Sequence, residues 1–477
     1  MGGGFSGTTL AVQLLRRIPT LSVAVVDKGS VPGRGLAYST EYDRHLLNVP
    51  ASNMSALPEE PDHFLRWARA NYDPSIQPTS FLPRRIYGRY VSSMLDEAMG
   101  RWGADHLRWI QGEASSFARE GSHIERPHIN VQLKDGSTLE AQCVVLAAGN
   151  FPPGNLRIPG LSERSERYVS SAWSASALRD IPKNGSVLLI GSGLKSIDVA
   201  IALKSEGFSG HIHILSRHGL IPQSHRQTGQ WPQYWSDQGP RTTRGLVRLV
   251  RNQIRAASAA GCDWRPVVDA LRSMTQMIWR SLPIKERKRF LRHVRPYWEV
   301  HRHRIAPEIG DAISRLFLEG HASLYAGRVT DYRECSDHVE VILRERKTGT
   351  QRSLRVDRVI NCTGPETDCR RIEASLIRSL LAQGLARPDS LFLGLDVDAE
   401  GAMIDSSGTP SDCLYAIGPA RKGRLWETIA VPELREQAYQ LAEHLASWLR
   451  PGLESSDCER LRLPLETLRT AQDPANR

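Results

Sequence analysis

The sequence lacks long hydrophobic runs and any segment that resembles an export signal. No apolar stretch approaches the roughly 20 residues that span a bilayer. The first residues, Met1 to Gly7, contain no basic region followed by an apolar stretch, which a secretory signal requires. We therefore expect a cytoplasmic protein that makes no contact with a membrane.

Cysteine is also scarce. The seven cysteines are odd in number, scattered along 477 residues, and include no CxxC pair. This spacing argues against a disulfide framework, a zinc site and a dithiol redox site, and we expect no bound metal. The cysteines are Cys143, Cys262, Cys335, Cys362, Cys369, Cys413 and Cys458.

Acidic residues are outnumbered by basic ones, with 52 Asp and Glu against 62 Lys and Arg. Much of the arginine excess lies in the segment 241–304, which also contains Trp264, Trp279, Tyr297 and Trp298. Interleaved basic and aromatic residues can neutralise and stack a nucleic acid. A solvated helical surface with its aromatics in a small core explains the same pattern. We favour this second interpretation and expect no nucleic-acid partner.

What the sequence does contain is a repeated α/β plan. In its second half, the apolar strand pattern 186–190 leads into a glycine turn, a helix pattern and another strand, 211–215. In its first half, a glycine turn, a helix pattern at 8–17 and a strand at 21–26 follow the same order. Each half then continues into a hairpin and a terminal strand. This duplication predicts an α/β fold of two Rossmann-like dinucleotide-binding domains of the three-layer ββα type.

A mostly helical pattern from 225 to 320 interrupts the second unit, and we predict that it is a helical insertion. The predicted first domain comprises residues 1–160 and 355–450. The predicted second domain comprises residues 161–224 and 321–354. Residues 451–477 are predicted to form a polar tail.

The first glycine loop has the features of a dinucleotide site. Gly2, Gly4 and Gly7 fit the GxGxxG pattern at the start of a predicted helix. Such glycines let the backbone approach a pyrophosphate at a helix N-terminus, where free N–H groups favour negative charge. Asp27 ends the next strand about twenty residues later, where a carboxylate can hydrogen-bond a ribose 2′-hydroxyl.

This first domain has one defect. Only Met1 precedes Gly2, so the first strand, normally at the centre of the parallel sheet, is missing from the sequence. Its loss would leave two neighbouring strands without ladder partners. Our hypothesis is a misplaced start, with a short apolar segment encoded upstream. A stop codon or polar codons in the upstream reading frame would refute it.

The second loop, Gly191-Ser192-Gly193-Leu194-Lys195-Ser196, has serine in place of the third glycine. The strand that follows it ends in Ser216, Arg217 and His218 and not in a carboxylate. A carboxylate there would repel a 2′-phosphate, whereas a hydroxyl and a guanidinium bind it. We therefore predict NADPH, in preference to NADH, at this loop.

Two dinucleotide loops in one chain indicate two different nucleotides, because a flavin and a hydride donor need separate sites. We predict FAD in the first domain and NADPH in the second. NADPH then reduces the flavin, and the reduced flavin acts on another molecule.

Further motifs extend from the first loop to Glu443. They are GRGLAYS (33–39), HLLNVP (45–50) with Met54, RRIYGRY (84–90), SRHGLIP (216–222), RPYWEVHRHRIAP (295–307), INCTGP (360–365) and TIAVPELR (428–435). Together with the two loops, they resemble the FAD/NAD(P)-binding oxidoreductases related to class B flavin-dependent monooxygenases. The resemblance covers most of the chain.

The resemblance implies that the flavin ring lies near Asn48, Asn53, Met54 and the segment 418–433. Residues 429–434 open a helix after a glycine-containing loop, and such an N-terminus suits the electron-rich edge of a reduced flavin. An ordinary helix start capped by Thr428 is the alternative. The predicted cofactor residues are Gly2, Gly4, Phe5, Ser6, Gly7, Asp27, Lys28, Gly35, Leu47, Asn48, Asn53, Met54, Arg84, Ala148, Gly149, Gly191, Gly193, Leu194, Ser196, Ser216, Arg217, His218, Gly364, Gly418, Thr428 and Val431.

One family feature is missing. The Baeyer-Villiger fingerprint, Phe-x-Gly-x-x-x-His-x-x-x-Trp, does not precede the second loop, where only Tyr168 and Trp173 fall. The resemblance therefore implies oxygenation of a heteroatom, such as N-hydroxylation of a small amine with O2. The alternatives are a flavin reductase or oxidase that uses another electron acceptor, and a nucleotide-sensing or nucleic-acid-binding module.

The sequence does not indicate which residue acts as a catalytic base, and we predict neither the catalytic residues nor the oligomeric state. His301 and His303 are two positions apart, which places them poorly on one helical face for metal binding. Other polar residues are candidates for contacts with a substrate or a flavin phosphate, with a structural role as the default. These are His225, His301, Arg302, Arg84 and Arg85.

Overall fold

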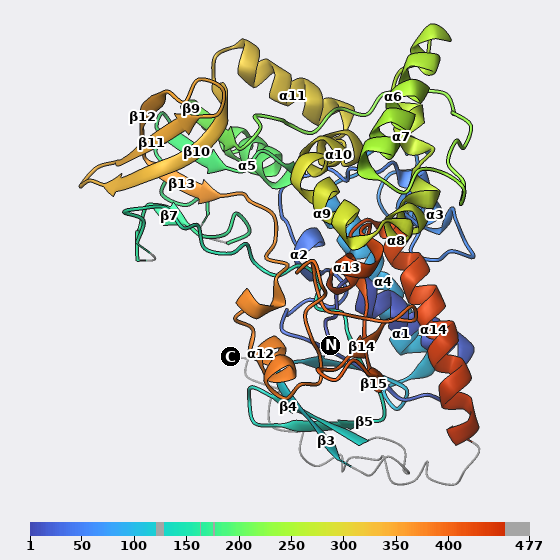
Figure 1. The fold of residues 1–477 in the computed structure, drawn as a ribbon. Coiled ribbons are helices and arrows are strands. Elements are labelled where there is room, and N and C mark those ends of the chain that lie inside the picture. The colour runs from blue at the N-terminus through green and yellow to red at the C-terminus, as the bar shows by residue number, and fades with distance from the viewer. Residues whose placement is uncertain (121–127, 163, 175–176, 454–477) are drawn as a thin grey trace.

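The chain forms two α/β domains and a group of helices beside them (Figure 1). The structure is a computed structural model and describes residues 1–120, 128–162, 164–174 and 177–453. Helix α14 (Val431–Leu453) is the last element. The rest of the predicted tail lies outside the described residues.

The first domain is built on three small sheets. One pairs β1 and β2 in parallel, one has the order β14-β15-β6, and one is the antiparallel set β3-β4-β5. The strands are β1 (Val23–Asp27), β2 (Leu107–Gln111), β3 (Ala114–Glu120), β4 (His128–Leu133), β5 (Thr138–Ala141), β6 (Val144–Leu146), β14 (Ala402–Ile404) and β15 (Pro410–Ala416).

Met1 and Gly2 occupy the position between β1 and β6. The carbonyl of Met1 accepts a hydrogen bond from Ala147 N at 2.7 Å, and the Met1 nitrogen donates to Val145 O at 2.8 Å. Gly2 N donates to Val26 O at 2.7 Å. Strands β1 and β6 belong to separate sheets. The first domain is thus divided at the place where the sequence predicts a missing strand.

Helices α1 (Phe5–Arg17) and α14 pack against each other beside these sheets. Their contact buries Leu10 and Leu14 of α1 against Leu441 and Leu445 of α14. Each pair is spaced by four residues, so both side chains project from one helical face. The other helices of this domain are α2 (Gly35–Tyr38), α3 (His63–Asn71), α4 (Arg84–Trp102), α12 (Ser375–Ala382) and α13 (Lys422–Leu425), with single 3-10 turns at η1 (Ala51–Asn53), η3 (Cys369–Arg371) and η4 (Gly418–Arg421).

The second domain contains a seven-stranded sheet in the order β12-β11-β10-β9-β8-β13-β7. Its inner strand β8 is buried throughout its centre, as expected for a parallel strand covered on both faces. Helix α5 (Leu194–Ser205) follows β8. The strands are β7 (Tyr168–Val169), β8 (Ser186–Ile190), β9 (His211–Ser216), β10 (Ala322–Glu334), β11 (Val339–Glu345), β12 (Gln351–Val356) and β13 (Arg358–Asn361).

The boundary of the second domain differs from the predicted one. Strand β13 pairs in parallel with β8 on one side and with β7 on the other. The second sheet therefore continues to Asn361, past residue 355, where the sequence placed the return to the first domain. The physical reason is that β13 supplies the ladder partner that the inner edge of β8 requires.

Six helices form the insertion, within the predicted range 225–320. They are α6 (Thr243–Ala259), α7 (Arg265–Asp269), α8 (Thr275–Ser281), α9 (Ile284–His293), α10 (Arg295–Arg302) and α11 (Pro307–Leu318), with a single 3-10 turn, η2 (Arg272–Met274). Along the described part of the chain, no helix is both long and apolar enough to cross a membrane.

The insertion interrupts the second domain in sequence but packs on the first. Trp279 of α8 stacks on Trp426 with ring centroids 5.0 Å apart, and its Nε1 donates to Gly423 O at 2.9 Å. Trp279 is buried and Trp298 packs against the same cluster, whereas Tyr297 is exposed. Two of the aromatics in the basic segment thus belong to a small core, as the solvated-surface interpretation predicts.

Candidate functional site

The first glycine loop crosses the end of β6 at close range. Gly2 has a φ of +104°, and a Cβ there would lie 2.2 Å from Ala147 O. A Cβ on Gly7 would lie 1.9 Å from Gly2 O. Gly4 is the N-cap of α1 and forms no side-chain cap, so the first N–H groups of α1 are open to an anion.

The second loop repeats this arrangement at the end of β13. Gly191 has a φ of +117°, and a Cβ there would lie 2.5 Å from Cys362 O. Gly193 is the N-cap of α5, and a Cβ on it would meet nothing within 4 Å. The Ser196 hydroxyl is buried without a hydrogen-bond partner among the described residues. This loop is an open cradle at the point where the strand order reverses, which is where α/β sheets bind ligands.

The Asp27 carboxylate ties the end of β1 to the first loop. One oxygen accepts from Gly3 N and the other accepts from Gly29 N at 2.6 Å. Lys28 beside it is exposed. Asp27 therefore stands at the predicted place, and its contact with a ribose stays a prediction.

Residues predicted from widely separated motifs meet beside this loop. Phe5, Leu47, Met54 and Val431 lie in one buried apolar cluster. The Thr428 hydroxyl is fully buried and has no hydrogen-bond partner within the described ranges. A buried polar group of this kind marks the place of a ligand or a water.

Other predicted cofactor residues are placed as follows. Gly418 has a φ of +79°, and a Cβ on it would lie 3.4 Å from Ser6 Oγ. A Cβ on Gly35, whose φ is +53°, would lie 3.0 Å from the Cα of Gly4. Four others are exposed, three of them after strand ends, and these are Asn53, Ala148, Gly149 and Gly364.

The end of β9 is a cationic corner. Arg346, in the turn between β11 and β12, donates to His218 Nδ1 and to Arg217 O at 3.4 Å. Burial and the two neighbouring guanidinium groups lower the pKa of His218. Ser216 Oγ accepts from Gly219 N at 3.0 Å. Sequence reasoning missed Arg346, because only the pairing of β10 with β11 brings it to this corner.

Arg84 has a contact that the sequence does not predict. Its guanidinium donates to both carboxylate oxygens of Asp198 on α5, at 2.7 and 3.2 Å, and both side chains are largely buried. His45 also hydrogen-bonds Asp198 O at 2.9 Å. Arg85 pairs with Asp43. The Arg84 guanidinium thus joins the two domains in this structure, and a role for it in binding a phosphate stays a prediction.

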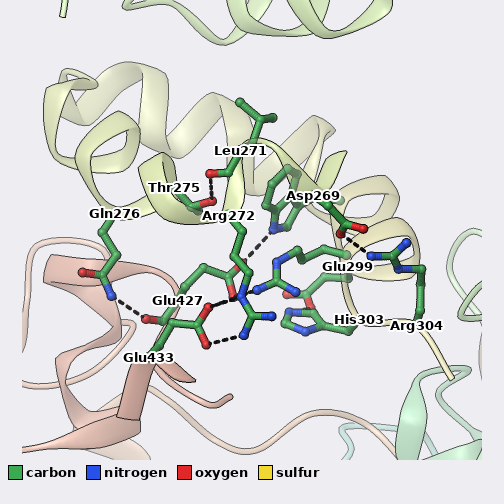
Figure 2. Close-up of polar contacts among 12 residues, drawn as sticks. Asp269, Leu271, Arg272, Thr275, Gln276, Glu299, His303, Arg304, Glu427 and Glu433 are labelled. Atoms are coloured by element: carbon green, nitrogen blue, oxygen red, sulfur yellow. Dashed lines mark hydrogen bonds and ion pairs between the residues drawn. The ribbon is translucent and has the colours of Figure 1, made fainter. Parts of the chain in front are cut away.

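An ion-pair network holds the insertion on the start of α14 (Figure 2). Arg272 donates to both oxygens of Glu433, at 2.9 and 3.1 Å. Arg302 donates to Glu433 Oε1 at 3.1 Å, and Trp298 Nε1 donates to Glu427 Oε1 at 3.0 Å. The Arg302 guanidinium, one of the candidate substrate contacts, is therefore engaged between α10 and α14.

The candidate histidines have separate partners. His225 Nε2 hydrogen-bonds Asn48 O at 3.0 Å, and burial lowers the pKa of His225 to about 4. His301 Nδ1 hydrogen-bonds Tyr297 O at 2.7 Å, whereas His303 Nε2 lies 3.3 Å from Glu299 Oε2. Among the residues that the structure describes, no group of three or more metal-ligating side chains is placed to hold a metal ion.

The N-terminal part of the chain matches a known sequence family. Residues 1–151 match the sequence model of a family described as FAD-NAD(P)-binding. No curated protein matches the chain by sequence.

Solved structures share the fold along almost the whole chain. The cadaverine monooxygenase of Erwinia amylovora, solved with FAD, is 14% identical with a TM-score of 0.64, covering 92% of each chain. The ornithine N-hydroxylase of Kutzneria sp. 744, solved with reduced FAD, NADP+ and L-ornithine, is 15% identical with a TM-score of 0.58. That match covers 94% of this chain and 98% of the other. The thioredoxin reductase of Lactococcus lactis is 13% identical with a TM-score of 0.53, covering 94% of this chain and 97% of the other.

The FAD-NAD(P)-binding sequence match is confined to residues 1–151, whereas the fold match extends over almost the whole chain. The chain therefore has the two-domain fold of these solved flavoenzymes. The α/β class and the two dinucleotide-type domains expected from the sequence are confirmed.

Proposed function

We propose that this protein is an NADPH-dependent FAD monooxygenase that hydroxylates the nitrogen of a small amine. The observation that carries the proposal is the pair of glycine cradles in one chain. Gly2 crosses the end of β6 at Ala147, and Gly191 crosses the end of β13 at Cys362. Each cradle leads into the N-terminus of a helix, where a pyrophosphate binds.

The residues of the first domain fit FAD. The N–H groups of Phe5, Ser6 and Gly7 lie in the first turn of α1 and are suited to the pyrophosphate. The buried Thr428 hydroxyl lacks a partner within the described ranges, and it precedes the start of α14, whose dipole favours negative charge. When bound there, FAD would supply the chemistry of hydride acceptance and O2 activation.

The second cradle fits NADPH. The open space at Gly193 leaves room for a pyrophosphate against α5. Arg217 and Arg346 meet at the end of β9 with Ser216, so the corner offers a hydroxyl and two guanidinium groups. This set suits the 2′-phosphate of NADPH. The 2′-hydroxyl of NADH carries no charge and would not form the same charged contacts.

Two features support an amine as the oxygenated substrate. Several solved structures that share the fold are described as hydroxylases or monooxygenases of ornithine, lysine and cadaverine. The sequence also lacks the Baeyer-Villiger fingerprint before the second loop. The protein's own part is to hold both nucleotides and to exclude water from the reacting atoms.

The test is a product assay on the FAD-loaded protein. NADPH and O2 are supplied with ornithine, lysine or cadaverine, and both hydroxylamine product and hydrogen peroxide are measured. The proposal predicts hydroxylamine in proportion to NADPH consumed for at least one small amine. Stoichiometric peroxide without hydroxylamine across a wider amine panel would instead establish a flavin oxidase or reductase.

A further inference from the structure

A basic groove runs between helices α6 and α9 of the insertion, apart from both glycine loops. It encloses about 510 Å³, and no acidic residue lines it. Its lining includes the apolar side chains of Val247 and Val294. Its basic lining residues are Arg244, Arg248, Arg251, Arg255, Arg289 and His293.

The arginines of α6 are stacked along one face of the helix. Arg244, Arg248, Arg251 and Arg255 are separated by four, three and four residues, and all four are exposed. Like charges at these spacings repel each other and destabilise a helix. Arg244 also lies in the first turn of α6, where the helix dipole disfavours a cation.

In the part of the chain that the structure describes, a carboxylate pairs with only one of the basic groups of this groove, Arg289. The nearest one on α9, Glu286, is buried and accepts from Thr243 N at 2.8 Å and from Arg289 Nη1 at 2.6 Å. Within the described residues, Arg244, Arg248 and Arg251 form no ion pair. The arginines of α6 therefore contribute positive charge to the groove without a paired carboxylate within the described residues.

We propose that this groove binds a small polyanion that carries two or more phosphate groups. Its volume lies within the range of about 300 to 1,000 Å³ that small-ligand sites occupy. Guanidinium groups match phosphate oxygens in paired hydrogen bonds, and five arginines line this groove. The lining contains no Phe, Tyr or Trp side chain. A strand of nucleic acid would therefore lack the large aromatic rings on which bases stack most strongly, so a small polyphosphate is favoured.

The test uses inorganic tripolyphosphate as the probe. Binding is measured by calorimetry on the whole FAD-loaded protein, and the groove variants distinguish binding in the groove from binding at the second glycine loop. The variant Arg248→Glu/Arg251→Glu reverses two charges in the groove. The control Arg315→Glu/Arg378→Glu makes the same change in net charge at exposed positions on α11 and α12. Thermal unfolding of both variants checks that each is folded, and Arg248→Gln/Arg251→Gln repeats the test without reversed charge.

The proposal predicts saturable binding of tripolyphosphate that falls about tenfold or more in both groove variants and stays unchanged in the control. The affinity should also decrease as salt increases, and less steeply in the groove variants. Equal binding by all variants, or no binding by the native protein, would overturn the proposal. So would tight binding of a DNA duplex in the groove with no binding of tripolyphosphate.

Discussion

At the scale of single residues, each loop contains glycines that the fold requires and glycines that a ligand requires. A Cβ on Gly191 would lie 2.5 Å from Cys362 O at a φ of +117°, whereas a Cβ on Gly193 would meet nothing within 4 Å. We expect Gly191→Ala to destabilise the protein by about 1 to 3 kcal/mol. Gly193→Ala should change stability by about 0.5 kcal/mol at most but weaken NADPH about tenfold.

Thermal unfolding and a titration with NADPH measure both effects. A similar loss of stability in the two variants would contradict the geometry of this loop. Both glycines are changed to alanine, so any difference between the variants reflects the position of the glycine and not the residue introduced.

The cationic corner makes a second prediction. If Arg346 binds a 2′-phosphate, Arg346→Ala should raise the KM for NADPH about tenfold and leave the KM for NADH nearly unchanged, because only NADPH carries that group. Arg217→Ala should act in the same direction. Arg344→Ala, an exposed neighbour on β11, is the control and should affect neither. Equal losses for both nucleotides would show that the corner does not recognise the phosphate.

His225 links stability to pH. Burial lowers the pKa of His225 from its usual value of 6.5 to about 4, so the folded state disfavours the protonated ring. Protons therefore bind the unfolded chain first, and His225 contributes stability above pH 6.5 that is lost as the pH falls toward 4. His225→Gln should show a smaller loss over this window in urea unfolding. If the free energy of unfolding fell equally with pH in the native protein and the variant, this pH dependence could not be assigned to His225.

At the scale of elements, the ion pairs of Glu433 with Arg272 and Arg302, the Glu433 network, hold the insertion on α14. Glu433→Gln would remove the carboxylate that pairs with Arg272 and leave the largely buried Arg302 with Glu427 alone, at 3.8 Å. We expect a loss of about 1 to 3 kcal/mol in the free energy of unfolding, because hydrogen bonds between charged groups are lost. Glu436→Gln, one turn away and exposed, is the control and should change stability by about 0.5 kcal/mol at most. Equal losses of stability in the two variants would mean that the Glu433 network contributes little to the free energy of unfolding.

The sequence predicts the elements where their signals are local. Strand β8 (Ser186–Ile190) has the predicted bounds, and α5 and β9 follow in the predicted order. The glycine turn, the buried strand and the helix that follows are all encoded within a few neighbouring residues. The same holds for the first loop and Asp27.

Contacts between distant elements carry no such local signal. Arg346 and His218 are 128 positions apart, and Arg272 and Glu433 are 161 apart. The sequence marks Arg302 and the segment 428–435 as notable, but it does not reveal that the two form an ion pair. Their meeting depends on how the insertion docks, which no periodicity encodes.

At the scale of the whole molecule, the insertion belongs to the second domain in sequence and to the first in space. An amphipathic pattern shows that one helix face is buried, but not which surface covers it. Stacking of Trp279 on Trp426 and the Glu433 network fix that surface beside η4, α13 and the start of α14. The Arg84–Asp198 pair then connects the first domain to α5 of the second. Together these contacts hold the two domains and the insertion against one another.

The most direct measurement is an anaerobic titration of the purified, FAD-loaded protein with NADPH and, separately, with NADH. If the two cradles hold FAD and NADPH as proposed, NADPH bleaches the oxidised flavin absorbance in a stoichiometric reaction, and NADH does so only at much higher concentration. A protein that retains no flavin, or a bound flavin that NADPH does not reduce, would contradict the account.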